Sequence, residues 1–143
     1  MRPYSEQVLR ALEHADVPVG CVVAAGGEVI AAAANERELR GDPTAHAEVL
    51  ALREASEKLG GWRLSDTVLY VTLEPCAMCA GAIVLARVPR VVWGAPDPKA
   101  GAAGSVLDVL GEAALNHRPD LAGGLLAEDA GEMLREFFGL RRK

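Results

Sequence analysis

Thr67-Val68-Leu69-Tyr70-Val71-Thr72-Leu73-Glu74-Pro75-Cys76-Ala77-Met78-Cys79 is the most informative stretch of the chain, because an apolar run breaks off at a proline followed by two cysteines. Residues 67–73 predict a central strand that is covered on both faces. Pro75 predicts the start of a helix, where a proline loses no hydrogen bond. Cys76 and Cys79 on its first turn would point both sulfurs to one side, as a tetrahedral metal site requires.

A candidate for the third metal ligand lies upstream, at His46 in His46-Ala47-Glu48. Asp42-Pro43 predicts a helix start, since aspartate caps free N–H groups and proline suits the first helical position. The helix should end at Gly60-Gly61. His46 and Glu48 are two residues apart and would face nearly opposite sides of a regular helix. Both can therefore serve one site only from the first turn.

The remaining elements follow from apolar periodicity and turn residues. We expect a helix over 6–15, a hairpin of strands 19–23 and 28–30 turning at Gly26-Gly27, a helix from Pro75 to Pro89, a strand over 90–94, a surface loop over 95–104, a weaker strand over 121–126 and a helix over 128–138. This order predicts an α/β fold, a three-layer αβα sandwich in which helices cover both faces of a mixed five-stranded sheet.

Composition limits the class of protein. A chain of 143 residues predicts one domain over 1–143, and it contains no apolar run of membrane-spanning length and no signal peptide, so we expect a soluble, cytoplasmic protein without a membrane partner. Three cysteines favour metal or thiol chemistry over a disulfide framework, with Cys21 interpreted as a small buried hydrophobe. The net charge of −5 counts against extensive phosphate binding but leaves local binding of nucleic acid open.

His46, Cys76 and Cys79 would leave one tetrahedral position of a zinc ion open, as catalytic zinc sites do. Glu48, beside the metal but not needed as a ligand, is then the natural proton shuttle. The pattern H-x-E…P-C-x-x-C is typical of zinc nucleobase deaminases, in which zinc-activated water displaces ammonia from an amidine-like carbon. C-x-x-C alone would more often indicate a structural zinc knuckle or a redox pair, and a lone histidine a core residue. The preceding proline and the H-x-E at a helix start favour the catalytic interpretation.

Several stretches resemble the bacterial tRNA-specific adenosine deaminases of the cytidine/deoxycytidylate deaminase superfamily. They are Asp16-Val17-Pro18-Val19-Gly20, Asp42-Pro43-Thr44-Ala45-His46-Ala47-Glu48, Leu73-Glu74-Pro75-Cys76-Ala77-Met78-Cys79-Ala80-Gly81-Ala82, Gly101-Ala102-Ala103-Gly104-Ser105, Leu115-Asn116-His117-Arg118 and Phe137-Phe138. The resemblance implies a cytidine deaminase-like fold and a homodimer with one zinc ion per chain. It also implies conversion of the wobble adenosine in a tRNA anticodon stem-loop, chiefly of an arginine tRNA, to inosine.

The resemblance also implies roles for single residues. His46, Cys76 and Cys79 look like the zinc ligands, Glu48 like the proton donor, and Asn35, Ala47, Asp97, Lys99, Phe138, Arg141 and Arg142 like substrate-binding residues. For Asn35, a turn-capping role is the alternative. The chain departs from the family at Pro96, where arginine is common, and at Ala100, where threonine is common, so we expect one backbone contact of the surface loop over 95–104 to be missing.

Two other functions remain open at this stage. One is a deaminase of free bases or nucleosides, of the guanine or cytosine type, which shares the zinc pattern. The other is a zinc-binding subunit without activity that presents RNA to a partner. Glu48 argues against the second, because a scaffold has no need of a carboxylate beside an open zinc.

Overall fold

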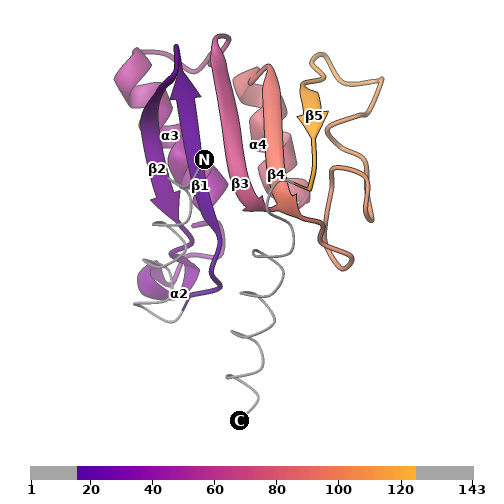
Figure 1. The fold of residues 1–143 in the computed structure, drawn as a ribbon. Helices are drawn as coiled ribbons and strands as arrows, with labels where there is room; N and C mark the ends of the chain where they lie inside the picture. The colour runs from indigo at the N-terminus through magenta and orange to yellow at the C-terminus, as the bar shows by residue number, and fades with distance from the viewer. Residues whose placement is uncertain (1–15, 125–143) are drawn as a thin grey trace.

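The computed structural model describes residues 16–124. Its elements are β1 (Gly20–Ala25), β2 (Glu28–Ala34), α2 (Arg37–Arg40), α3 (Ala47–Leu59), β3 (Thr67–Leu73), α4 (Ala77–Ala86), β4 (Arg90–Ala95) and β5 (Asp120–Ala122). The strands form one sheet in the order β2-β1-β3-β4-β5 (Figure 1). β1 is antiparallel to β2 and β3, whereas β3, β4 and β5 pair in parallel. The mixed five-stranded sheet is therefore confirmed, and β3 lies at its centre as predicted.

The hairpin of β1 and β2 forms at the predicted turn. Gly26 and Gly27 have φ angles of 58° and 81°, the left-handed conformation that a tight hairpin turn needs and glycine adopts without steric cost. β2 runs to Ala34, four residues further than the sequence indicated, and pairs with β1 along its length. This extension matters for the site, because the residue after β2 is Asn35.

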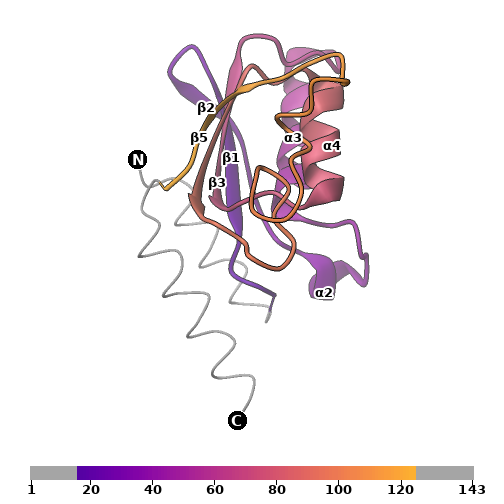
Figure 2. The same cartoon turned by 90° about the vertical axis from the view of Figure 1, so that its right-hand side faces the viewer.

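Two helices, α3 and α4, pack side by side on one face of the sheet (Figure 2). Alternate residues of the central strands, including Cys21, Val23, Leu69 and Val71, are buried in the core they share with these helices. Val22, which points to the opposite face of β1, is also fully buried. The centre of the sheet is thus covered on both faces, and Cys21 is a buried hydrophobe as expected.

Several predicted boundaries were wrong, among them the start of α4, which is Ala77 and not Pro75. α3 begins at Ala47 and not at Asp42, because the Asp42 carboxylate accepts hydrogen bonds from both the N–H and the hydroxyl of Thr44, each at 2.8 Å, and closes a local turn instead. α4 ends at Ala86, before Pro89, because Arg87 turns left-handed at φ 62°. β5 begins one residue before the predicted strand and ends at Ala122.

The predicted helices over 6–15 and 128–138 lie outside the described residues, as do the last residues of the strand predicted over 121–126. No helix between residues 16 and 124 has the length and apolar character that crossing a membrane would take. The helix α2 was not predicted at all.

The carboxyl ends of β2, β3 and β4 meet at one edge of the sheet, where α2 and the first turns of α3 and α4 also lie (Figure 1). Ligands of open α/β sheets bind outside the carboxyl ends of strands. Residues 96–119, which connect β4 to β5, contain no helix or strand and only an isolated bridge between Ala103 and Asp108. The fold therefore brings loops and helix starts together at this edge.

Candidate active site

The three predicted metal ligands meet where α3 and α4 begin. His46 and Cys76 are the residues that precede the two helices, and neither side chain caps its own helix. Cys79 lies in the first turn of α4 and is fully buried. The Nδ1 atom of His46 lies 3.4 Å from the sulfur of Cys79 and 3.7 Å from the sulfur of Cys76. One ligand atom from each residue thus falls within 4.8 Å of the others.

These separations fit a zinc ion. Zn–N and Zn–S bonds of roughly 2.0 and 2.3 Å at a tetrahedral angle place nitrogen and sulfur about 3.5 Å apart, between the two observed distances. One imidazole and two thiolates also form the kind of donor set that zinc prefers. Because three protein ligands make up this group, a zinc ion held here would keep one position open for water or substrate.

The two cysteine thiols have very different pKa values when no metal is bound. A hydrogen bond from Cys79 lowers the pKa of Cys76 to about 4, although burial opposes this, and His46 lowers it further. The pKa of Cys79 is raised, mainly because Cys79 donates that bond and also because Cys79 is buried. The pair alone therefore holds a single negative charge, and a divalent cation is what would make both sulfurs thiolates.

Glu48 lies on the first turn of α3, two residues after His46, with 4% of its surface exposed. Burial raises the pKa of Glu48 to about 7, and the negative charge of Cys76 adds to this effect. Its own backbone N–H and the charge of His46 act in the opposite direction. A carboxyl group with such a pKa can both accept and donate a proton near neutral pH.

A cavity of about 160 Å³ opens beside the candidate metal ligands. It is lined by Val17, Val19, Asn35, Arg37, His46, Ala47, Glu48, Leu73, Glu74, Cys76, Asp97 and Ala100. The volume is below the roughly 300–1,000 Å³ typical of sites for drug-sized ligands. The cavity therefore suits one small planar group and not a whole nucleotide.

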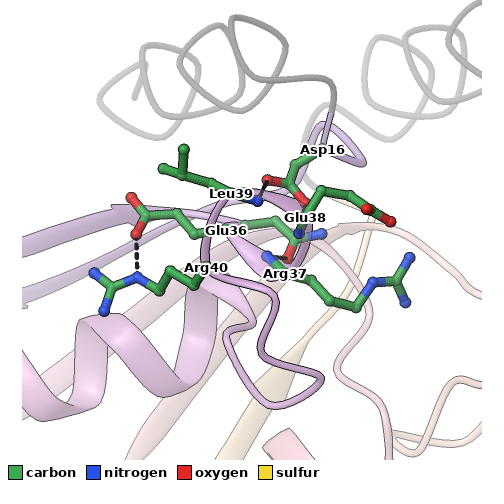
Figure 3. A network of polar contacts seen from close by, with 7 residues as sticks. Asp16, Glu36, Arg37, Glu38, Leu39 and Arg40 are labelled. Atoms are coloured by element: carbon green, nitrogen blue, oxygen red, sulfur yellow. Dashed lines mark hydrogen bonds and ion pairs between the residues drawn. The ribbon is translucent and has the colours of Figure 1, made fainter.

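Asn35 lines this cavity and also stabilises the chain around it. Its Nδ2 donates to the carbonyl of Val17 at 3.4 Å, and its Oδ1 accepts from the N–H of Arg37 at 3.4 Å. The turn-capping role that the sequence left open is thus observed, together with a position on the cavity wall. The start of α2 is held by Asp16, whose buried carboxylate accepts from the N–H groups of Glu38 and Leu39 at 2.7 and 3.3 Å (Figure 3).

Two residues that line the cavity, Arg37 and Glu74, were not predicted from the sequence. Arg37 is exposed at the cavity wall and adds a positive charge there. Its signal in the sequence was weak, because it is one of two arginines in a polar segment, residues 35–42. Glu74 is 3% exposed, and its carboxylate accepts hydrogen bonds from the N–H groups of Asp97, Ala103 and Ser105. Its position directly before Pro75-Cys76 was the available signal.

The structure brings six predicted residues to one cavity: Asn35, His46, Ala47, Glu48, Cys76 and Asp97. The buried Cys79 lies beside His46 and Cys76 without lining the cavity. Lys99 is exposed on the loop of residues 97–105, which we call the rim loop. It lies between two cavity-lining residues, Asp97 and Ala100, without lining the cavity itself. Phe138, Arg141 and Arg142 lie outside the described residues. The chain departs from the family pattern at two positions. Pro96 is exposed directly before Asp97, and Ala100 lines the cavity.

Comparison with known proteins gives consistent matches. The model of the MafB19-like deaminase family matches residues 1–142. A tRNA-specific adenosine deaminase of Bacillus subtilis (strain 168) is 47% identical over 143 residues, which is 100% of this chain and 89% of that protein. A tRNA-specific adenosine deaminase of Agrobacterium fabrum is 45% identical over 130 residues, covering 91% of this chain and 86% of the relative.

Solved structures agree with these matches. One, from a study of A-to-I editing by tRNA:A34 deaminases at the wobble position of transfer RNA, has a TM-score of 0.89 and 41% identity and covers 93% of this chain and 96% of its own. A guanine deaminase from Bacillus subtilis has a TM-score of 0.62 and 32% identity, with 96% and 88% covered. The likeness to the first structure confirms the predicted cytidine deaminase-like αβα fold.

Proposed function

This chain belongs to the MafB19-like deaminase family and to the tRNA-specific adenosine deaminases, and we propose that it converts adenosine to inosine at the wobble position of a tRNA anticodon. The observation that carries the proposal is the convergence of His46, Cys76 and Cys79 with Glu48 on one small cavity. We propose that the substrate is an arginine tRNA. We also propose that residues 1–143 form one deaminase domain and that the enzyme acts in the cytoplasm.

His46, Cys76 and Cys79 would hold one zinc ion per chain. When bound there, zinc supplies activation of a water molecule for attack on the base carbon that carries the amino group. Glu48 takes the proton from that water and donates it to the adjacent ring nitrogen. The same carboxylate then helps transfer a proton to the departing amine, so that water and adenosine become inosine and ammonia.

The other cavity residues orient the base. Asn35 and Ala47 line the cavity together with Leu73 and Glu74 from the end of β3, and we propose that Asn35 and Ala47 contact the edge of a purine. A cavity of about 160 Å³ accepts the base and leaves the sugar and phosphates outside. A substrate within RNA therefore has to be contacted beyond the cavity, and for that role we propose Asp97 and Lys99 of the rim loop together with Phe138, Arg141 and Arg142.

We propose a homodimer that uses the outer face of α3 and α4. Trp62 and Leu85 are 57% and 70% exposed and line one groove there. The groove also carries Arg53, Glu57 and Arg87, and a surface with both signs of charge can pair with its own copy across a two-fold axis. Light scattering at micromolar concentration tests this: Leu85→Asp should yield monomers, and a wild-type enzyme that is active and purely monomeric would refute the dimer.

The decisive experiment compares substrates at equal concentration. The zinc-loaded protein is incubated with an anticodon stem-loop carrying adenosine at the wobble position, and separately with free adenosine, adenine, guanine, cytosine and cytidine. Inosine or ammonia is measured. We expect the stem-loop to react far faster than any free base or nucleoside, because only RNA can use contacts outside the cavity.

The second candidate is a deaminase of free guanine, favoured by the 32% identity to the Bacillus subtilis guanine deaminase. Efficient turnover of guanine with an intact stem-loop would establish that function and refute the tRNA assignment. A protein that binds the stem-loop and zinc but releases no ammonia from any of these compounds would instead indicate a subunit that only presents RNA.

A further inference from the structure

Glu74 is a buried carboxylate whose partners are all hydrogen-bond donors without a charge. Oε1 accepts from the N–H of Asp97 at 3.1 Å and from the hydroxyl of Ser105. Oε2 accepts from the N–H groups of Ala103 and Ser105 at 2.9 and 3.1 Å. Within residues 16–124 no Lys, Arg or His forms an ion pair with it. A buried charge is costly unless hydrogen bonds replace its water, so this set of donors is what allows the carboxylate to lie there.

All these donors come from the rim loop, residues 97–105, which contains no helix or strand of its own. The loop also closes tightly around the carboxylate. A Cβ added to Gly101 would lie 2.5 Å from the Oε2 of Glu74, far inside van der Waals contact. The N–H of Ala102 donates to the carbonyl of Pro75 at 2.8 Å. The loop is therefore held by Glu74 and by the residue that follows it in the chain.

The same residues border the candidate active site. Glu74, Asp97 and Ala100 line the cavity, and Cys76 is two residues beyond Glu74. We propose that Glu74 is a positioning residue, whose carboxylate fixes the rim loop over the base cavity at a set distance from the metal ligands and so enables the enzyme to bind a base that is still part of RNA. This rests on the proposed function, and it deepens that function by assigning the shape of the RNA-binding rim to one side chain.

Glu74→Gln tests the proposal with little change in volume. A carboxylate accepts on both oxygens, whereas an amide puts an NH2 donor in the place of one of them. Whichever way the amide turns, its NH2 group faces at least one N–H group of the rim loop. Losing one hydrogen bond to a charged acceptor should raise the equilibrium constant for local opening of the loop by a factor of about ten to a hundred. We therefore expect local opening of the loop while the sheet and the metal ligands keep their places.

The first readout is amide hydrogen exchange of the zinc-loaded protein. In Glu74→Gln, the amides of Asp97, Ala103 and Ser105 should exchange at least about tenfold faster, with amides of β1 and β3 unchanged and one zinc ion per chain retained. Glu54→Gln is the matched control, because the Glu54 carboxylate accepts the N–H of Ala32 at 2.8 Å far from the rim loop. It should leave the rim amides as in the wild type.

The second readout is steady-state kinetics. Glu74→Gln should raise the KM for the stem-loop about tenfold or more with kcat within about threefold, whereas the KM for free adenosine, which has no flanking nucleotides for the rim loop to contact, should rise by a smaller factor. Ser105→Ala removes the hydroxyl that donates to Glu74 and keeps the N–H groups. It should raise the KM for the stem-loop by a smaller factor, and it replaces Glu74→Gln in the test if that variant does not fold.

Wild-type exchange and KM in Glu74→Gln would overturn the proposal, and so would equal acceleration of exchange throughout the sheet. Faster exchange of the rim-loop amides in Glu74→Gln, in a protein that never deaminates the stem-loop, would instead support the positioning role of Glu74 and refute the proposed function.

Discussion

Replacing Gly101 with alanine should strain the rim loop by an amount that the structure defines. The new Cβ would lie 2.5 Å from the carboxylate of Glu74 and 2.6 Å from the carbonyl oxygen of Asp97, whereas ordinary contact begins near 3.4 Å. Neither neighbour can move freely. The Asp97 carbonyl accepts the N–H of Gly101 at 2.9 Å, and the Glu74 carboxylate is held by the loop. Overpacking of this kind costs about 1–3 kcal/mol, which corresponds to a fall in melting temperature of about 3–10 °C.

Thermal unfolding of the zinc-loaded protein measures this change, and Gly61→Ala is the control. A Cβ added to Gly61 has no atom within 4 Å, and Gly61 has no positive φ, so the methyl group meets open space there. Both substitutions restrict the unfolded chain equally, and any difference between them arises in the folded state. The reasoning is refuted if Gly101→Ala unfolds at the same temperature as Gly61→Ala.

Two further predictions concern the candidate active site. Glu48→Gln should lower kcat for the stem-loop by at least about a hundredfold while zinc content and melting temperature are retained, because glutamine fills the same space but carries no transferable proton; activity within tenfold of the wild type would assign proton transfer to another residue. Cys76→Ala should lose the zinc ion, measured by elemental analysis, and unfold at a lower temperature; a full complement of zinc in this variant would contradict the ligand set.

Where the sequence predicted the fold well, the signal was local. Residues 67–73 form β3 with the predicted bounds, because a long apolar run is followed at once by a residue pair that ends strands, Glu74-Pro75. The start of α3 was misplaced because Asp42-Pro43 suits a helix cap and a tight turn equally well. The turn prevails because Thr44 offers the Asp42 carboxylate both an N–H and a hydroxyl. Nothing in the spacing of apolar residues distinguishes these outcomes.

Long-range contacts explain what the sequence did not reveal. α2 has only four residues, and the N–H groups of Glu38 and Leu39 donate to the carboxylate of Asp16, more than twenty positions earlier in the chain. Similarly, Glu74 binds backbone N–H groups of the rim loop, and every residue except proline carries such a group. The grouping of the candidate metal ligands was predictable because their side chains are rare and specific. The residues that position the surrounding loops were not, because their partners are backbone atoms.

The dependence of RNA binding on salt tests how an acidic chain can hold RNA. Each phosphate contact to a single strand contributes a slope of about −0.7 in log K against log salt concentration. Arg37 and Lys99 are the exposed cations on or beside the cavity wall among residues 16–124, and two contacts give about −1.4. If Arg141, Arg142 and Lys143 each add one contact, the slope of the whole chain is about −3.5.

Fluorescence anisotropy of a labelled stem-loop with Glu48→Gln, which binds without turnover, measures this slope between about 50 and 200 mM salt. Deleting residues 141–143 should flatten the slope to about −1.4 with zinc content unchanged. Lys58→Ala is the control, since Lys58 is exposed at the end of α3 and does not line the cavity. A slope that is the same with and without residues 141–143 would mean that the tail makes no phosphate contact. The few cations near the cavity would then have to hold the RNA alone.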